Sequence, residues 1–132
     1  MYYRLIFSVF ILSVFSSCSF KIAEKKIENS KLILNDIAHE KFNDNYKVNY
    51  NHTGEFAIVM KREKKFTDLF PDLKYFVFSL NSKSIIIEDS LKAGNVYWEN
   101  DYFLKAFERE QLAKSYIYEY SFDVKNKVYK LN

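Results

Sequence analysis

The stretch YIYEYSFDV, residues 116–124, decides the fold class of this chain. Large apolar side chains occupy every second position, and Glu119, Ser121 and Asp123 stand between them. Because successive side chains of a β-strand point to opposite faces, this period of two predicts a strand with one buried face. The side chains predicted to be buried are Tyr116, Tyr118, Tyr120, Phe122 and Val124.

The same alternation, interrupted by short polar turns, predicts further strands before this stretch and one after it. They cover residues 46–50, 55–61, 74–80, 84–88, 96–98, 102–108 and 127–131. Residues 74–80 and 84–88 carry apolar side chains on both faces, so we expect these two strands at the centre of a sheet.

One segment follows a helical period instead. Its apolar side chains recur at the spacing of one helix face: Ile33, Leu34, Ile37, Ala38 and Phe42. Ser30 can cap the first turn, so we predict a helix over residues 31–42. The expected fold class is mainly β (α+β): an antiparallel β meander of about seven to eight strands, with one N-terminal helix that covers a sheet face or an edge.

A weak internal repeat divides the predicted strands into two units. Residues 78–85 match residues 122–129, and each of these hairpins follows another hairpin. Two hairpins per unit, repeating about every 40 to 45 residues, resemble the blade of a β-propeller. Two units cannot close a ring that usually takes about 4 to 8 blades, so we expect an open meander and no complete propeller.

The N-terminal segment has the order of parts of a secretory signal peptide. Arg4 precedes an apolar run over residues 5–15, and the small residues Ser16 and Ser17 lead into Cys18. The sequence Phe15-Ser16-Ser17-Cys18 resembles the signal of bacterial lipoproteins, with Phe15 where that family usually has an aliphatic residue. The resemblance implies cleavage before Cys18 and lipid attachment, such as palmitate, to its thiol.

The resemblance also implies the domain organisation and the location. We expect a signal peptide at 1–17, a lipidated tether at 18–29 and a single mainly β domain at 30–132. The expected location is the bacterial cell envelope, at the outer membrane or the periplasmic face, with the lipid in the membrane. A membrane-spanning helix is not expected, because spanning takes about 20 apolar residues. Plain secretion, an uncleaved anchor and a cytosolic location remain alternatives.

Composition points the same way and excludes one class of partner. Abundant Asn, Lys, Ile, Phe and Tyr with little Gly resemble the usage of small envelope lipoproteins of Bacteroidetes. Basic and acidic side chains nearly balance, so we expect no nucleic-acid binding. The sharpest basic cluster is KREKK at 61–65, which favours a solvated connection after a strand; a contact with anionic lipid or polysaccharide is the alternative.

Motifs for nucleotide or metal chemistry are missing from the sequence. With only Gly54 and Gly94, the chain has no Gly-rich phosphate loop. His39 and Glu40 begin a zinc-protease pattern, but Asn43 stands where the second histidine belongs. We therefore expect no metal site and no cofactor.

Neighbouring carboxylates are the remaining candidates for catalysis. The pairs are Glu88 with Asp89, Glu99 with Asp101, and Glu108 with Glu110. Glycoside hydrolysis needs two carboxylates that face each other across a cleft, whereas carboxylates in loops and at strand ends usually serve solubility. We interpret these residues as solubilising groups and expect no enzymatic activity.

Aromatic residues around one turn form the candidate partner surface. Tyr97, Trp98 and Tyr102 flank Asn100-Asp101, and aromatic side chains often dominate binding energies. Ser90, within Asp89-Ser90-Leu91, resembles the acceptor of Bacteroidetes O-glycosylation. The expected function is that of a lipid-anchored, non-catalytic binding or assembly module with an envelope protein or glycan as partner. The alternative is a small hydrolase accessory or an enzyme inhibitor of the envelope.

Overall fold

The computed structural model describes residues 26–63, 71–109 and 116–131 of the chain. The side chains of residues 116–118 and 131 lie outside this description, as do the whole of the predicted signal peptide and Cys18. Among the described residues, no helix combines the length and the apolar character needed to cross a membrane.

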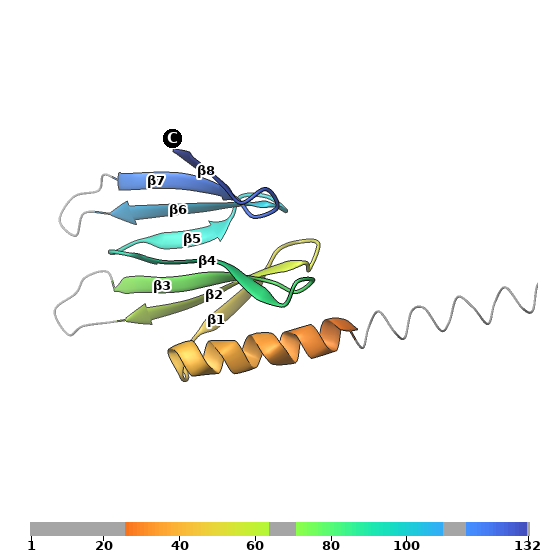
Figure 1. The fold of residues 1–132 in the computed structure, drawn as a ribbon. Coiled ribbons are helices and arrows are strands. Elements are labelled where there is room, and N and C mark those ends of the chain that lie inside the picture. Colours follow the sequence, from red (N-terminus) through yellow and green to blue (C-terminus); the bar gives the residue numbers. More distant parts are fainter. Residues whose placement is uncertain (1–25, 64–70, 110–115, 132) are drawn as a thin grey trace, which may run out of the picture.

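Two four-stranded antiparallel sheets and one helix make up the described structure (Figure 1). The first sheet contains β1 (Lys47–Tyr50), β2 (Phe56–Glu63), β3 (Asp72–Ser79) and β4 (Ser84–Leu91). The second sheet contains β5 (Asn95–Trp98), β6 (Phe103–Arg109), β7 (Tyr116–Asp123) and β8 (Val128–Leu131). Each sheet is a simple meander, because neighbours in sequence are also neighbours in the sheet. The mainly β fold class, the strand number and the N-terminal helix are confirmed.

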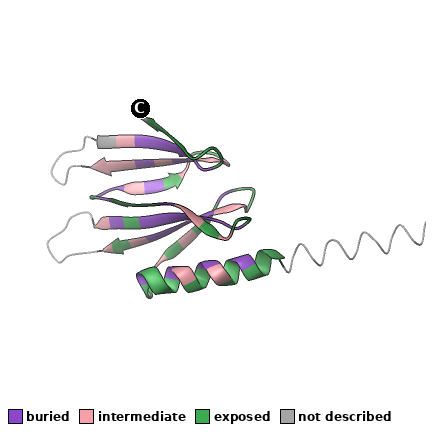
Figure 2. Cartoon of the chain, viewed as in Figure 1, coloured by how far each residue is buried: buried purple, intermediate pink, exposed green. Residues whose placement is uncertain are grey.

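The structure consists of three stacked layers, namely the helix, the first sheet and the second sheet, rather than one continuous meander. Buried residues from both sheets form a single core between them, with Tyr75, Val77 and Ile58 on one side and Tyr120 and Phe122 on the other. The hydroxyls of Tyr75 and Tyr120 hydrogen-bond each other inside this core. Burial is therefore concentrated on the middle strands of each sheet (Figure 2).

The helix, residues 26–42, covers the face of the first sheet that points away from the second. Leu34, Ala38 and Phe42 are buried there, and the Phe42 ring lies 5.5 Å from the ring of Phe76 on β3. Lys61 at the end of this layer donates from Nζ to the backbone oxygen of Phe42 at 2.6 Å. A cation on the last helical carbonyls stabilises a helix C-terminus, so Lys61 is a structural residue.

The predicted start of the helix is wrong. Residues 26–29, expected in the tether, are already helical. Ser30 is not an N-cap but a buried helical residue whose Oγ donates to the backbone oxygen of Lys26 at 2.9 Å. A serine inside a helix commonly makes this bond to the carbonyl four residues earlier. The capping pattern was misleading because the same side chain satisfies either role.

The predicted central position of residues 84–88 is also wrong. They belong to β4, which is an edge strand of the first sheet, whereas β3 is central as expected. A register shift at Val77 and Phe78 inserts an extra residue into β4, so that Ile85 faces the helix while Ile86 and Ile87 face the second sheet. Apolar side chains on both faces reflect the two covering layers and not a position between strands.

Strand β7 confirms the predicted burial of the described apolar side chains but not the prediction that only one face is buried. Tyr120, Phe122 and Val124 are buried between the sheets. Ser121 and Asp123 on the other face are buried as well. Asp123 accepts hydrogen bonds from the backbone N–H groups of Asn126 and Lys125, at 3.0 Å each, and from the side-chain amide of Asn126 at 2.7 Å. The hydrogen bonds from Asn126 and Lys125 hold the pKa of this carboxyl below its usual range.

Each of the two predicted repeat units forms one of the two sheets. Phe76 and Phe78 of β3 face the helix, and the matching Tyr120 and Phe122 of β7 face the first sheet. The helix therefore takes the place that a preceding sheet would occupy. The opposite face of the second sheet carries half-exposed side chains such as Phe107, and no described element covers it.

Candidate binding groove beside strand β5

The predicted partner residues Tyr97 and Trp98 lie on opposite faces of strand β5. Tyr97 is 41% exposed on the outer face of the second sheet, and its ring meets Phe107 edge-on with centroids 6.4 Å apart. Trp98 packs against the core between the sheets, and its Nε1 donates to the backbone oxygen of Asn49 on β1 at 3.0 Å. The alternation of strand side chains separates the two rings.

Tyr102 also has structural partners. Its hydroxyl donates to Glu55 at 3.1 Å, and this hydrogen bond raises the pKa of Tyr102 above its ordinary value. Its ring packs edge-on against Phe56, with centroids 6.2 Å apart. The structure does not bring the three predicted aromatic residues together. Their role as a partner surface stays a prediction, and Tyr97 is the one whose side chain is most open to a partner.

Three of the carboxylates considered for catalysis contact other groups of the protein, and Glu110 lies outside the described residues. Glu88 accepts from Lys41 Nζ at 2.8 and 3.0 Å, and Asp89 accepts from the hydroxyl of Tyr120 at 2.8 Å. Glu108 accepts a hydrogen bond from the backbone N–H of Lys92 at 2.9 Å. In the described ranges, no group of three or more His, Cys, Asp and Glu residues could hold a metal ion.

Ser90, the predicted glycosylation acceptor, lies on the edge strand β4 and is exposed. Its backbone N–H is hydrogen-bonded to the carboxylate of Asp89 at 2.7 Å. The exposed position leaves the hydroxyl accessible to a modifying enzyme. Glycosylation of Ser90 stays a prediction.

A groove of about 450 Å³ runs beside strand β5, between this strand and the first sheet. Six of its lining residues define its chemistry: Lys47, Asn49, Met60, Arg62, Asn95 and Tyr97. Strands β1 and β2 form the floor, because their side chains at these positions point toward the second sheet. Tyr97, predicted from the sequence as a contact residue, belongs to this lining.

The wall of the groove is the free edge of the second sheet. Among the described strands, β5 pairs with β6 only. The N–H of Glu99 donates to the backbone oxygen of Phe103. Because hydrogen-bonded positions alternate along an antiparallel pair, the backbone groups of Tyr97 and Asn95 also bond to β6. The backbone groups of Val96 and Trp98 consequently point to the free edge. Among the described residues, no hydrogen-bond partner is found for these edge groups of Val96 and Trp98.

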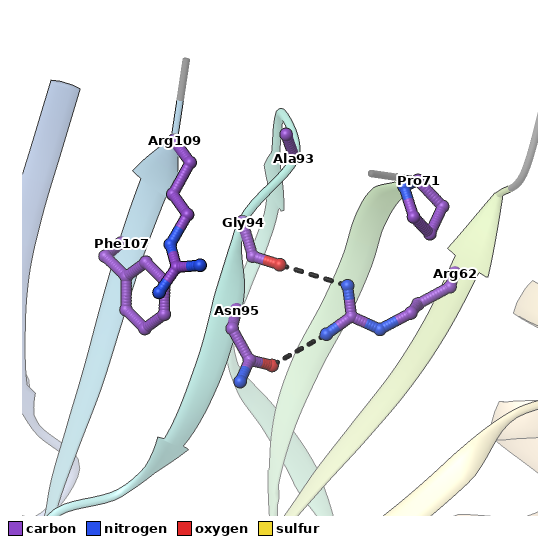
Figure 3. Close-up of a pocket in the computed structure, with 7 residues that line it drawn as sticks. All are labelled: Arg62, Pro71, Ala93, Gly94, Asn95, Phe107 and Arg109. Carbon is purple, nitrogen blue, oxygen red and sulfur yellow. Dashed lines mark hydrogen bonds between the residues drawn. The ribbon is translucent and has the colours of Figure 1, made fainter. Parts of the chain in front are cut away.

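Arg62 closes one end of the groove and joins it to a second pocket (Figure 3). Its guanidinium donates to the backbone oxygen of Gly94 at 3.1 Å and to the side-chain oxygen of Asn95 at 2.9 Å. This pocket, of about 310 Å³, is also lined by Phe107 and Arg109. The Arg109 guanidinium lies over the Phe107 ring, 5.3 Å from its centroid.

Gly94 is required at this end of β5. A Cβ atom built on it would lie 2.4 Å from the backbone oxygen of Phe107 and 2.6 Å from the Cβ of Leu91. Only glycine lets the chain enter β5 so close to its neighbours. The close approach places the carbonyl of Gly94 where Arg62 can reach it.

The lining of both cavities is positively charged. Lys47, Arg62 and Arg109 contribute three cations, and no described lining residue is acidic. Asn49 and Asn95 add amide groups that donate and accept hydrogen bonds. The arrangement is suited to a ligand that combines negative charge with groups able to pair with an open strand edge.

The sequence pattern alone does not predict this groove. Arg62 belongs to the basic cluster that favours a solvated connection after the predicted strand 55–61, and this interpretation is wrong for Arg62, which lies in β2. The available signal was the alternation of Ile58, Met60 and Arg62, which places the arginine on the face that meets the second sheet. Which strand Arg62 meets depends on how the sheets stack.

No family model, curated protein or solved structure matches this chain.

Proposed function

We propose that this protein is a lipid-anchored module of the bacterial cell envelope that binds a partner without catalysing a reaction. In this proposal Cys18 carries the lipid, and the described domain holds the partner in the groove beside β5. The partner is an envelope protein or a glycan. The observation that carries the proposal is the groove itself, with its cationic and amide lining and, as one wall, a strand edge that no described strand pairs with.

Two further features support binding at this place. Tyr97 offers an amphipathic ring at the rim, and tyrosine side chains bury large area at low conformational cost. The floor rests on the core between the sheets, because Met60 is buried there. A preformed groove lowers the entropy that binding loses.

The proposal predicts that one tyrosine controls capture of the partner. Tyr97→Ala in the full chain, immobilised in detergent and exposed to envelope extract, should weaken retention of the partner about thirtyfold, since a tyrosine hot spot is worth about 2 kcal/mol. Retention is measured as the amount of partner bound at increasing extract concentration, and circular dichroism checks that the variant is folded.

Tyr50→Ala is the matched control. Tyr50 is 40% exposed, close to the value for Tyr97, but its ring lies near Lys31 of the helix and not in the groove. Capture by Tyr50→Ala should equal that of the wild type. Equal losses in the two variants, or no loss in either, would contradict binding in the groove.

A further inference from the structure

We infer that the groove takes an extended peptide segment with acidic side chains, which adds to β5 as another strand of the second sheet. The inference rests on the proposed function and names the class of partner. The carrying observation is the coincidence of an unpaired strand edge, a groove along this edge and a positively charged floor.

The edge supplies the backbone part of the recognition. Val96 and Trp98 present N–H and C=O groups toward the groove, and an extended chain laid beside β5 would pair with them. Natural proteins protect open strand edges, so an uncovered edge inside a groove is a site for strand addition. Arg62 already occupies the carbonyl of Gly94, which marks where the added strand ends.

The floor supplies the side-chain part. In an added strand, every second side chain would point down toward β1 and β2. Lys47 stands there, exposed, and Arg62 stands at the end of the groove. Because no described lining residue is acidic, carboxylates at these positions would meet uncompensated positive charge. Asn49 is the next β1 residue on this face after Lys47, on the side away from Arg62, and offers an amide.

A peptide is favoured over a glycan by the edge. A sugar chain offers hydroxyl groups without the repeat of an extended backbone, so it would leave the regular pattern of strand donors and acceptors partly unpaired. An added peptide strand can pair with each donor and acceptor of the edge. The opposite face of an added strand would lie beside Tyr97, which can cover a β-branched side chain there.

The test uses synthetic peptides of about six residues, the usual length of a strand, in which glutamate alternates with valine. Binding to the full chain in detergent is followed by the backbone amide signals of β5 in NMR spectra. The glutamate peptide should bind saturably below about 1 mM and shift the signals of Val96 and Trp98. A twin with lysine in place of glutamate should bind at least about tenfold more weakly.

Backbone methylation separates strand addition from simple charge attraction. Two further glutamate peptides carry N-methyl groups at either the odd or the even positions. Only one set of N–H groups can face β5, so one methylated peptide should lose binding and the other should keep it. Equal behaviour of the two peptides, whether both bind or neither does, would overturn the inference.

A charge reversal tests the floor. Lys47→Glu should weaken binding of the glutamate peptide about tenfold, because attraction becomes repulsion at an exposed site. Lys26→Glu, on the exposed first described turn of the helix, is the control and should leave binding unchanged. If Lys47→Glu binds as tightly as the wild type, or if the wild type does not bind below about 1 mM, the inference fails. The Tyr97 capture result can still hold in that case, and the partner is then a glycan or another class of protein surface.

Discussion

Cys18→Ala is expected to abolish incorporation of radiolabelled palmitate, because the substitution removes the thiol that would carry the acyl chain. Each buried methylene of an acyl chain contributes about 0.8 kcal/mol, and stable anchoring takes more than one chain, so the predicted lipid anchor depends on this one residue. The measurement is autoradiography of the purified chain. Cys18 is the only cysteine of the chain, so no second thiol can take the label.

Ser19→Ala provides the control for this experiment. It changes a small polar residue next to Cys18 and leaves the predicted cleavage motif and the thiol intact. Its labelling should equal that of the wild type. Equal labelling of Cys18→Ala and the wild type would contradict lipid attachment at this residue, and the predicted anchor would have to be abandoned.

The second large effect concerns the layer between the helix and the first sheet. Phe76→Ala should lower the free energy of unfolding by about 3 to 5 kcal/mol, the range for truncating a buried phenylalanine. The Phe76 ring is fully buried and packs against Phe42 of the helix. Domains of this size are stable by about 5 to 15 kcal/mol, so the variant should unfold at a much lower urea concentration.

Leu32→Ala is the matched control for Phe76→Ala. Leu32 belongs to the helix that packs on Phe76, but its side chain is 60% exposed. Its truncation should therefore change the free energy of unfolding by no more than about 0.5 kcal/mol. The urea midpoints of the two variants are compared with the wild type. Similar midpoints for Phe76→Ala and Leu32→Ala would show that the helix does not pack on this face.

The strands were predictable because the signal is local. Alternation along 116–124 requires only neighbouring residues, and it predicted the burial of Tyr120 and Phe122. The division into two units was visible in the match between 78–85 and 122–129. Their stacking was not, because the core joins residues such as Tyr75 and Tyr120 that are far apart in sequence.

The misplacement of β4 has the same physical origin. A strand with apolar residues on both faces is central if the protein has one sheet, but it can stand at an edge if layers cover both faces. Ile85 contacts the helix layer, and Ile87 contacts the second sheet. Sequence alternation reports that a face is covered but not which element covers it.

The candidate site was predictable only in part. Tyr97 was identified from its place near a turn, and it lines the groove. The separation of Tyr97 from Trp98 could have been expected, because consecutive strand residues point to opposite faces. The partnership of Arg62 with Gly94 and Asn95 depends on the stacking of the two sheets, which leaves no mark in the local pattern.

Hydrogen exchange at three neighbouring amides tests the central claim, an open strand edge in a binding groove, most directly. In the free protein the N–H groups of Val96 and Trp98 face the groove, whereas the N–H of Tyr97 faces β6. We predict fast exchange at Val96 and Trp98, slow exchange at Tyr97, and slow exchange at all three once the captured partner is bound. Equal protection of the three amides in the free protein would contradict the open edge, as would unchanged exchange at Val96 and Trp98 in the complex.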